Sequence, residues 1–580
     1  RYYKAGDNVH VHGKISTQKP LTMDHPEAEV DEEGDEFIHL KRVVPVYRLT
    51  EGVQQRWLRS VMWQAVDQFA EKVPDIHSNW IEGDDGYWFP LNKAFKVVHF
   101  PDDTEQATLA RERLALEEFI RFYCRIKDKR QLFQSKIKAL DCSGDDRLMK
   151  PFLSNIGFDL TGAQQRAWFD ISRDMKGSFP MRRLLQGDVG SGKTIVSLLS
   201  AFNTVNSGFQ VALMAPTEIL ARQHYTLAKE IFPKNINIKL ISGKSDYKSK
   251  KIILNELSKH KIDIIFGTHA IFQKKVNFKK LGLIIIDEQH KFGVNQRKRL
   301  SDKGGNNCDV LLMTATPIPR TLTMTMYGDM DLSIIREKPK SRKPIKTYSK
   351  LESKIDDVLK FIKKEIRLGN QIFWVCPLIE ESKKIDHSSA VKKFEYLDKL
   401  FPNQVSLLHG KTDIEEKEII LNRFLKNEFK ILVSTTIIEV GIDFPNANVI
   451  IIENANKFGL SQLHQLRGRV GRGDKESTCI LMFKSNLSEN AKKRINILKD
   501  TNDGFIISEE DMKIRGFGDI LGFKQSGIKN FKLADPIHNN DLFLLAEKEM
   551  RRIEKSNENI SKFKPLIKLY DRADIINDIA

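Results

Sequence analysis

A phosphate-binding loop constrains what this chain can fold into more than any other stretch of the sequence. Residues 185–194 read LQGDVGSGKT, which contains the pattern G-x-x-x-x-G-K-T. Glycines in such a loop let the backbone come close to phosphate oxygens and present N–H donors to them. Residues 181–185 are predicted to form a short strand before the loop, and 195–199 begins a predicted helix whose N-terminal dipole faces the phosphates. The sequence therefore predicts a nucleotide site, whose loop residues are Gly187, Asp188, Gly190, Ser191, Gly192, Lys193 and Thr194.

Four side chains in and before the loop would complete the contacts to a nucleotide. Lys193 would place a cation on the β- and γ-phosphates, and the Thr194 hydroxyl would be a ligand for Mg²⁺. Upstream, Gln164 would read the edge of adenine, because its amide both donates and accepts hydrogen bonds, and Phe158 would stack on the ring. The alternative for these last two residues is a buried aromatic side chain and a helix cap at Thr161.

The composition indicates a multidomain globular chain with a polyanionic partner. At 580 residues the chain should form roughly three to five domains. The formal net charge of +17 and pI near 9.3 favour nucleic acid as the partner, although a lysine-rich solvated surface would give the same balance. The five cysteines are scattered without a C-x-x-C pair, which favours a reducing compartment over disulfides or a zinc site. The longest apolar runs have the length of strands, and no signal peptide is evident, although the sequence starts without Met.

Alternating strands and helices predict an open parallel sheet over about 151–335. Polar clusters come after four apolar segments, and ligands bind at this carboxyl edge in open parallel α/β sheets. The clusters contain Thr217 after 210–214, Thr268 and His269 after 262–266, Asp287 to His290 after 281–286, and Thr314 and Thr316 after 310–313.

Two adjacent carboxylates in the third cluster would divide the work of hydrolysis. Asp287 would hold Mg²⁺ together with Thr194, and Glu288 would orient or deprotonate the attacking water. An acidic pair after a strand is commonly a solvated turn, but the phosphate loop upstream favours the catalytic role. Among the other cluster residues, Gln289 and His290 would sense the γ-phosphate, and Thr314 and Thr316 would relay that state. Contacts to a nucleic-acid backbone are expected from Thr217, Thr268 and His269, for which loop capping is the alternative.

The first 150 residues predict a small β-segment and then helices. Alternation over 7–15 predicts one strand and 37–40 a second, with an exposed acidic loop over 27–36 between them. Apolar residues at helical spacing predict helices over 53–72 and 103–140. Because two strands cannot form a domain alone, we expect them to be the end of a β-domain that begins before Arg1.

A second alternating block, about 336–490, carries no phosphate loop. It offers Arg469 and Arg472, which would share one face if the segment is helical. An arginine there would stabilise charge on the γ-phosphate during hydrolysis, with a basic nucleic-acid-binding face as an alternative that can coexist. A Lys- and Arg-rich linker at 336–350 precedes the predicted strands, which lie at 371–375, 404–408, 430–434 and 449–452.

The order of these motifs over two α/β halves resembles a superfamily-two helicase motor. Longer strings, including LLQGDVGSGKT, MAPTEILARQH, IIDEQHKFGVNQR, LMTATPIPRTL and QLHQLRGRVGRG, resemble the bacterial RecG family of ATP-dependent DNA helicases. The resemblance runs from about Asp7 to the C-terminus and is most specific over 158–527. The segment 515–527 resembles the helical-hairpin translocation motif that the family shares with the transcription–repair coupling factor, although Phe517 stands where Pro is commoner.

The resemblance implies a motor that uses ATP and Mg²⁺ to move along double-stranded DNA. It implies 3′-to-5′ unwinding, fork regression and branch migration of Holliday junctions in recombination and repair. Arg515 and Gln525 would couple lobe closure to DNA movement. In the second half we also expect nucleotide contacts from Gly441 and Asp443, and DNA contacts or coupling from Thr435 and Thr436.

The expected fold is α/β, with two tandem RecA-like parallel-sheet lobes and smaller parts on either side. The five parts are a partial OB-like wedge domain (1–46), a helical linker (47–150), an ATP-binding lobe (151–335), a second lobe (336–490) and a helical-hairpin translocation module (491–580). The family's duplex-splitting aromatics would precede Arg1, so Tyr2 and Tyr3 are not assigned that role, and we expect the chain to keep the ATPase and DNA-binding elements. Expected partners are branched double-stranded DNA and single-strand-binding protein, with the chain a monomer in the bacterial cytoplasm at the nucleoid.

Three other functions compete with this interpretation. A transcription–repair coupling translocase shares the motor and hairpin but would carry RNA-polymerase-binding modules, which no segment here supplies. A non-catalytic junction-binding protein is disfavoured by the intact catalytic candidates, which are Lys193, Asp287, Glu288, Arg469 and Arg472. An RNA helicase is disfavoured by the family resemblance alone, because motors that track the backbone leave few base-reading signals.

Overall fold

The chain folds into two compact units, Arg1–Arg130 with Ile528–Ala580, and Gln131–Gly527. Each unit has its own strands and helices. The structure, a computed structural model, describes residues 4–31, 37–73, 75, 90–134, 141–142, 144, 146–241, 247–273, 275–288, 308–318, 323, 330–339, 342–377, 383–410, 412–435, 444–471, 473, 475–515, 531–536 and 538–555. Within these residues, no helix combines the length and the apolar character that crossing a membrane requires.

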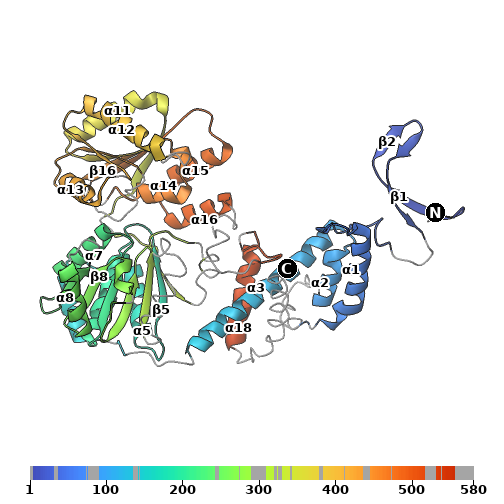
Figure 1. Ribbon diagram of the computed structural model, residues 1–580, viewed down its shortest axis with the longest axis horizontal. Helices are drawn as coiled ribbons and strands as arrows, with labels where there is room; N and C mark the ends of the chain where they lie inside the picture. The colour runs from blue at the N-terminus through green and yellow to red at the C-terminus, as the bar shows by residue number, and fades with distance from the viewer. Residues whose placement is uncertain are drawn as a thin grey trace. The chain divides into compact units, whose positions relative to one another are not determined.

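The first unit contains two short antiparallel strand pairs and a set of helices (Figure 1). The pairs are β1 (Val9–His12) with β4 (Glu27–Val30), and β2 (Ile15–Gln18) with β3 (Leu21–Met23). The helices are α1 (Gln55–Phe69), η1 (Ala70–Lys72), α2 (Leu91–His99), α3 (Thr104–Gln134) and α18 (Asn540–Lys555).

The predicted N-terminal strands were wrong in one place. No strand forms over 37–40, and β4 lies instead at the start of the predicted acidic loop. The Glu29 carboxylate of β4 accepts hydrogen bonds from the backbone N–H groups of Ile38, His39 and Leu40, at 3.1, 3.1 and 2.8 Å. These donors are therefore not available for a strand ladder.

The C-terminal segment packs against α3 of the first unit. The Glu118 carboxylate accepts hydrogen bonds from the backbone N–H groups of Lys532, Leu533 and Ala534, and Phe119 makes edge contacts with Phe543 of α18. By contrast, α15 (Glu489–Asp500) and α16 (Gly504–Arg515) belong to the second unit. The predicted C-terminal module, 491–580, is thus divided between two units instead of forming one body.

The first lobe of the second unit is a seven-stranded parallel sheet with the order β11-β5-β10-β9-β6-β8-β7. Its strands are β5 (Arg182–Gly187), β6 (Gln210–Met214), β7 (Ile238–Ile241), β8 (Ile264–Gly267), β9 (Leu281–Ile286), β10 (Asp309–Thr314) and β11 (Asp331–Ile335). The helices around it are α4 (Asp146–Asn155), α5 (Gly162–Met175), α6 (Lys193–Asn206), α7 (Glu218–Ile231), α8 (Tyr247–Ser258) and η2 (His269–Phe272).

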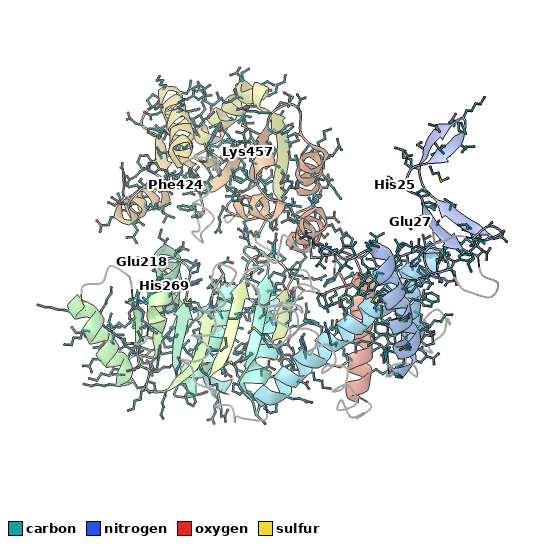
Figure 2. The ribbon with its side chains drawn as sticks, turned by 45° about the vertical axis from the view of Figure 1, so that its right-hand side comes forward. His25, Glu27, Glu218, His269, Phe424 and Lys457 are labelled. Atoms are coloured by element: carbon teal, nitrogen blue, oxygen red, sulfur yellow. The ribbon has the colours of Figure 1, made fainter. Side chains whose placement is uncertain are left out.

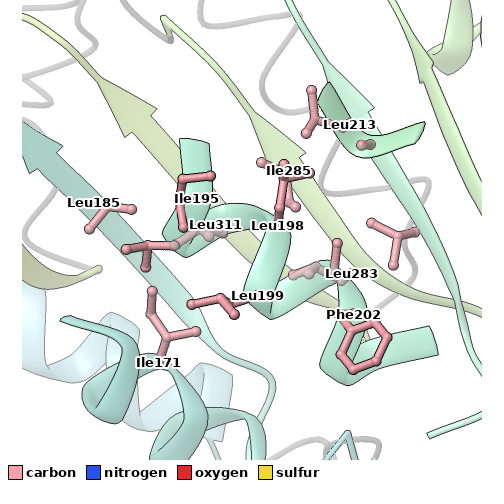
Figure 3. Close-up of a cluster of buried hydrophobic side chains, with 14 of the residues drawn as sticks. Ile171, Leu185, Ile195, Leu198, Leu199, Phe202, Leu213, Leu283, Ile285 and Leu311 are labelled. Carbon is pink, nitrogen blue, oxygen red and sulfur yellow. The ribbon is translucent and has the colours of Figure 1, made fainter. Parts of the chain in front are cut away.

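Both faces of this sheet are buried, which is why its strands read as continuous apolar runs. Leu283 and Ile285 of β9 point to one face, where they pack with Leu199 of α6 (Figure 3). Ile284 and Ile286 point to the other face. The alternating side chains of one strand therefore pack into two separate apolar layers. This packing fixes the strand and gives the loops at its carboxyl end a rigid support.

The second lobe is a six-stranded parallel sheet with the order β12-β17-β16-β13-β15-β14. Its strands are β12 (Ile345–Leu351), β13 (Gln371–Val375), β14 (Val405–Leu408), β15 (Ile431–Ser434), β16 (Ala447–Ile452) and β17 (Ser477–Phe483). Its helices, besides α15 and α16, are η5 (Glu352–Lys354), α11 (Ile355–Arg367), α12 (Lys383–Leu400), α13 (Ile414–Leu425), η7 (Ala455–Lys457) and α14 (Leu460–Arg467).

One sequence-based expectation for this lobe was wrong. The predicted linker 336–350 contains most of β12, which pairs with β17 and begins the sheet. Helix α14 ends at Arg467 with Gly468 as its C-cap, so Arg469 lies beyond the helix, and Arg472 lies outside the described residues.

Candidate nucleotide site

The phosphate loop connects β5 to α6, as the sequence predicted. Gly190 and Gly192 have φ angles of +75° and +85°, a region that side chains with a Cβ rarely adopt. The Gln164 side-chain nitrogen occupies the place of a Cβ at 192 and donates to the Ser191 carbonyl at 2.9 Å. The Arg342 guanidinium occupies the place of a Cβ at 190. A larger residue at either glycine would clash and would strain the backbone.

Lys193 is buried at the first position of α6, beneath this loop. Its ammonium donates to the Gly187 carbonyl at 2.7 Å and to the Asp188 carbonyl at 3.0 Å. Burial lowers the pKa of Lys193, while the charges of Glu288 and Asp287 oppose that shift. The phosphate oxygens of a nucleotide would compete with these carbonyls for the same ammonium.

Asp287 comes directly after β9 and is held by a histidine that the sequence reasoning missed. The Asp287 carboxylate lies 2.8 Å from His224 Nε2, and its other oxygen accepts from the Glu288 backbone N–H at 2.9 Å. Burial alone would raise the pKa of Asp287, but the hydrogen bond and charge of His224, with Lys193 nearby, hold it below its usual value. Asp287 is therefore a carboxylate at neutral pH, as a metal ligand must be.

Glu288 links this strand end to the next one. Its φ of +47° is uncommon for a residue with a Cβ, and such conformations gather at functional sites. The Glu288 carboxylate accepts from the Ala315 backbone N–H at 3.2 Å, between Thr314 and Thr316, whose hydroxyls lie 2.8 Å apart. The predicted relay segment thus contacts the predicted catalytic carboxylate.

A cavity of about 1160 Å³ brings these residues together with the second lobe. Lys193, Thr194, Asp287 and Glu288 line it from the first lobe, and Arg469 lines it from the second. Sequence reasoning assigned all five to one reaction, and the structure places them around one space. Their chemical roles stay predictions.

The first lobe and the second lobe also meet through Asp188. Its carboxylate lies 2.7 Å from His464 Nε2 and 2.6 Å from Lys338 Nζ. Burial would raise the pKa of Asp188, but His464 and Lys338 hold it well below its usual range. Arg342 adds a second bridge, because its guanidinium donates to the carbonyls of Val189 and Gly468 at 2.6 and 3.1 Å.

The sequence did not single out four residues of this site, His224, Lys338, Arg342 and His464, whereas Asp188 was among the predicted loop residues. His224 and His464 lie inside the strings MAPTEILARQH and QLHQLRGRVGRG, so those strings were the available signal. Nothing local to Arg342 distinguishes it from other basic residues of the predicted linker.

The residues before the loop make intramolecular contacts. Thr161 and Gln164 form a reciprocal capping box at the start of α5, which is the alternative that the sequence left open. The other part of that alternative, a buried aromatic side chain, is wrong, because Phe158 is 54% exposed. Adenine recognition by Gln164 and Phe158 stays a prediction.

The predicted nucleic-acid contacts occupy different environments. Thr217 caps α7 by accepting from the Leu220 N–H, and Thr268 directly precedes η2, whose first residue, His269, is exposed. His269 and Glu218, the residue after Thr217, lie at the upper edge of the first lobe in Figure 2. Thr435 is 2% exposed, so direct contact with DNA does not fit its position. A role of Thr435 in coupling stays a prediction. Arg515 ends α16, and the assignments outside the described residues are Gln289, His290, Thr436, Gly441, Asp443, Arg472 and Gln525.

Three family models match successive parts of the chain. The model for DEAD/DEAH box helicases matches residues 161–325, and the helicase conserved C-terminal domain matches residues 353–474. The model described as ATP-dependent DNA helicase RecG, domain 3, C-terminal, matches residues 501–569. The first two matches fall on the two lobes, and the third begins just before α16.

Curated relatives extend this similarity over most of the chain. ATP-dependent DNA helicase RecG of Bacillus subtilis (strain 168) is 43% identical over 502 residues, which cover 86% of this chain and 73% of that protein. The protein of the same name from Synechocystis sp. is 41% identical over 569 residues, 96% of this chain and 67% of that protein. A solved structure described as RecG bound to a three-way DNA junction is 38% identical, with a TM-score of 0.64 over 92% of this chain and 70% of that one.

Proposed function

The chain belongs to the RecG family of ATP-dependent DNA helicases, and from this premise we propose that the unit Gln131–Gly527 is a motor for branched double-stranded DNA. ATP is its fuel. The single observation that carries the proposal is the cavity lined by Lys193, Thr194, Asp287 and Glu288 from one lobe and by Arg469 from the other. A nucleotide bound there would touch both lobes, so its hydrolysis would change how they are held together.

The proposed chemistry divides between the two lobes. Lys193 binds the β- and γ-phosphates, and Glu288 orients the attacking water and accepts its proton. Arg469 stabilises the charge that develops on the γ-phosphate oxygens. This division is supported by the acidic groups and the lysine on one wall and the arginine on the other.

Mg²⁺ fits the donors present. Thr194 supplies a hydroxyl and Asp287 an ionised carboxylate, and Mg²⁺ is typically bound by one or two such oxygens together with nucleotide phosphates. When bound, the ion would neutralise phosphate charge. His224 would then keep the Asp287 side chain in one orientation.

The DNA substrate is proposed from the relatives. The related structure is described as bound to a three-way DNA junction, and we extend branched DNA to this chain, with fork regression, Holliday junction branch migration and 3′-to-5′ unwinding as the expected reactions. We further propose that the chain acts as a monomer, cooperates with single-strand-binding protein, and works in the bacterial cytoplasm at the nucleoid.

Steady-state ATP hydrolysis tests this function directly. It would be measured without DNA and with single strand, linear duplex, a fork and a three-way junction. We expect the branched substrates to stimulate most. Equal stimulation by linear duplex would point to a generic double-stranded DNA translocase, and no stimulation by any DNA would refute the proposal.

Two variants test the assigned catalytic roles. Lys193→Ala and Glu288→Gln should each lower hydrolysis by at least about 100-fold, because each removes a group that acts on the γ-phosphate or its attacking water. Binding to a labelled three-way junction should survive in both. Loss of junction binding in Glu288→Gln would count against its assigned role.

A further inference from the structure

One buried polar contact joins the phosphate loop to the helix that begins at Gly504. Asp188 and His464 are 3% and 5% exposed, and their hydrogen bond of 2.7 Å crosses from the first lobe to the second. The main-chain carbonyl of Asp188 also accepts a hydrogen bond from the Lys193 ammonium, at 3.0 Å. Asp188 therefore contacts Lys193 through its backbone and contacts the second lobe through its side chain.

The opposite side of the His464 ring is connected to the end of α15. His464 Nδ1 lies 2.9 Å from the Arg467 guanidinium. An arginine can only donate, so Nδ1 accepts, and the ring proton of neutral His464 is on Nε2, pointing at Asp188. Arg467 also donates to the carbonyls of Leu498 and Thr501, at 2.7 and 2.9 Å. The contact thus continues to the three-residue turn that precedes α16.

Gly504 closes this path by direct packing. A Cβ at residue 504 would lie 2.7 Å from His464 Nε2 and 2.9 Å from the Asp188 Cγ. These distances are shorter than any normal contact of a Cβ, so a side chain at 504 would push the pair apart. Lys338 reinforces the junction, because it bridges the Asp188 carboxylate and the Asn502 carbonyl, at 2.6 and 3.3 Å.

We propose that His464 is a positioning residue that links the occupancy of the phosphate loop to the position of α16. The inference rests on the proposed function and deepens it. Nucleotide phosphates would draw the Lys193 ammonium away from the carbonyl of Asp188, and the Asp188 side chain would pass that change through His464 to Gly504. Helix α16 ends at Arg515, a residue expected to act on DNA movement. Coupling of this kind needs a chain of packed groups between two sites, which these contacts supply.

Gly504→Ala is the sharpest test, because the chain offers a matched control. Gly162 is also the first residue of a helix, yet a Cβ there would meet nothing closer than 3.4 Å. Gly162→Ala should therefore behave as wild type. Gly504→Ala should lower the stimulation of ATP hydrolysis by three-way junction, relative to hydrolysis without DNA, by about fivefold or more.

His464 variants keep the proposal testable if Gly504→Ala fails to fold. His464→Ala should reduce stimulation as Gly504→Ala does, and it should also reduce the number of strands displaced per ATP hydrolysed. His464→Gln can still donate to Asp188 and should recover part of both. A merely structural role would instead lower the melting temperature without changing the strands displaced per ATP.

The outcomes separate this inference from the proposed function. Wild-type stimulation in both Gly504→Ala and His464→Ala would overturn the inference and leave the motor assignment intact. Equal loss in Gly162→Ala and Gly504→Ala would also overturn it, since any substitution at a helix start would then suffice. If the wild-type chain hydrolyses ATP without any response to DNA, the proposed function itself fails.

Discussion

The two lobes of the second unit share one strand order but differ in the segments attached to the ends of their strands. Six strands of the first sheet, β5-β10-β9-β6-β8-β7, correspond in order and direction to β12-β17-β16-β13-β15-β14 of the second. After β5 the chain forms the phosphate loop, whereas after β12 it forms the short helix η5. The same scaffold therefore carries different chemistry, because the chemistry lies in the loops at the carboxyl edge.

The correspondence reaches one buried side chain. Each central strand begins with a buried glutamine, Gln210 in β6 and Gln371 in β13. Each amide donates to two main-chain carbonyls at the end of a neighbouring helix and in the loop after it, at 2.9 and 2.9 Å from Gln210 and at 2.6 and 2.8 Å from Gln371. The scaffold is thus repeated in its polar contacts as well as in its strand order.

The edge of the sheet is where the scaffolds diverge. In the first lobe β11 covers β5, so β5 is buried along almost its whole length. In the second lobe β12 is itself the edge, and exposed residues alternate along it. A buried strand supports the phosphate loop rigidly. The strand that precedes η5 carries no such loop and does not need to be buried.

The largest expected effect tests whether the second lobe takes part in chemistry. Arg469→Ala should lower ATP hydrolysis by about 1000-fold, because an arginine finger stabilises charge in the transition state. ATP binding, measured by fluorescent-nucleotide titration, should change little. Arg423→Ala is the control, since Arg423 pairs with Glu428 and neither residue lines the cavity. Near-normal hydrolysis in Arg469→Ala would confine the chemistry to the first lobe.

The next effect contrasts the first strands of the two sheets. Arg183 of β5 is 4% exposed and lies 2.6 Å from the Asp174 carboxylate, so Arg183→Ala leaves this half-buried carboxylate only its longer pair with Arg173, at 3.9 Å, and should cost about 3 kcal/mol. Lys346 of β12 pairs with Glu476 in solvent, and Lys346→Ala should leave stability unchanged. Urea denaturation measures both. Similar values for the two variants would mean that the edge strand is as tightly held as the covered one.

A pH effect should distinguish two corresponding strands, β10 of the first lobe and β17 of the second. Burial raises the pKa of Asp309, at the start of β10, to about 7, whereas β17 starts with Ser477, which does not ionise at these pH values. Between pH 4 and 7 the unfolded chain is ionised at 309 while the folded chain stays protonated. The Asp309 contribution is thus complete below pH 4 and is lost as pH rises through 7.

Asp309→Asn removes this ionisation. Between pH 4 and 8 the unfolding free energy of this variant should fall less than that of wild type. The difference between the two falls should be up to about 4 kcal/mol, at 1.36 kcal/mol per unit of pKa. Denaturation across that range measures it, with Ser477→Ala expected to keep the wild-type slope. An unchanged slope in Asp309→Asn would show that another group carries the pH dependence.

The smallest effects test the repeated glutamine. Gln210→Leu and Gln371→Leu each remove two hydrogen bonds to main-chain carbonyls, and each should cost about 2 kcal/mol. The two values should agree within the error of urea denaturation. A cost confined to one variant would show that the two lobes repeat only in strand order.

Contiguous features of the sequence determined the phosphate loop and the buried strands of both lobes. The phosphate loop, the strands β9 and β13 and the acidic pair were all predicted, because a strand buried on both faces is a continuous apolar run and a loop motif needs only neighbours in sequence. The family resemblance was confirmed by relatives that match most of the chain.

Tertiary structure alone decided the rest. Asp188 and His464 are separated by 276 positions, and no local pattern connects them. Strand β12 reads as a basic linker because an edge strand exposes its lysines, and residues 37–40 form no strand because the Glu29 carboxylate takes their donors. Periodicity reports burial along one segment, whereas a contact between distant segments depends on where the whole chain places them.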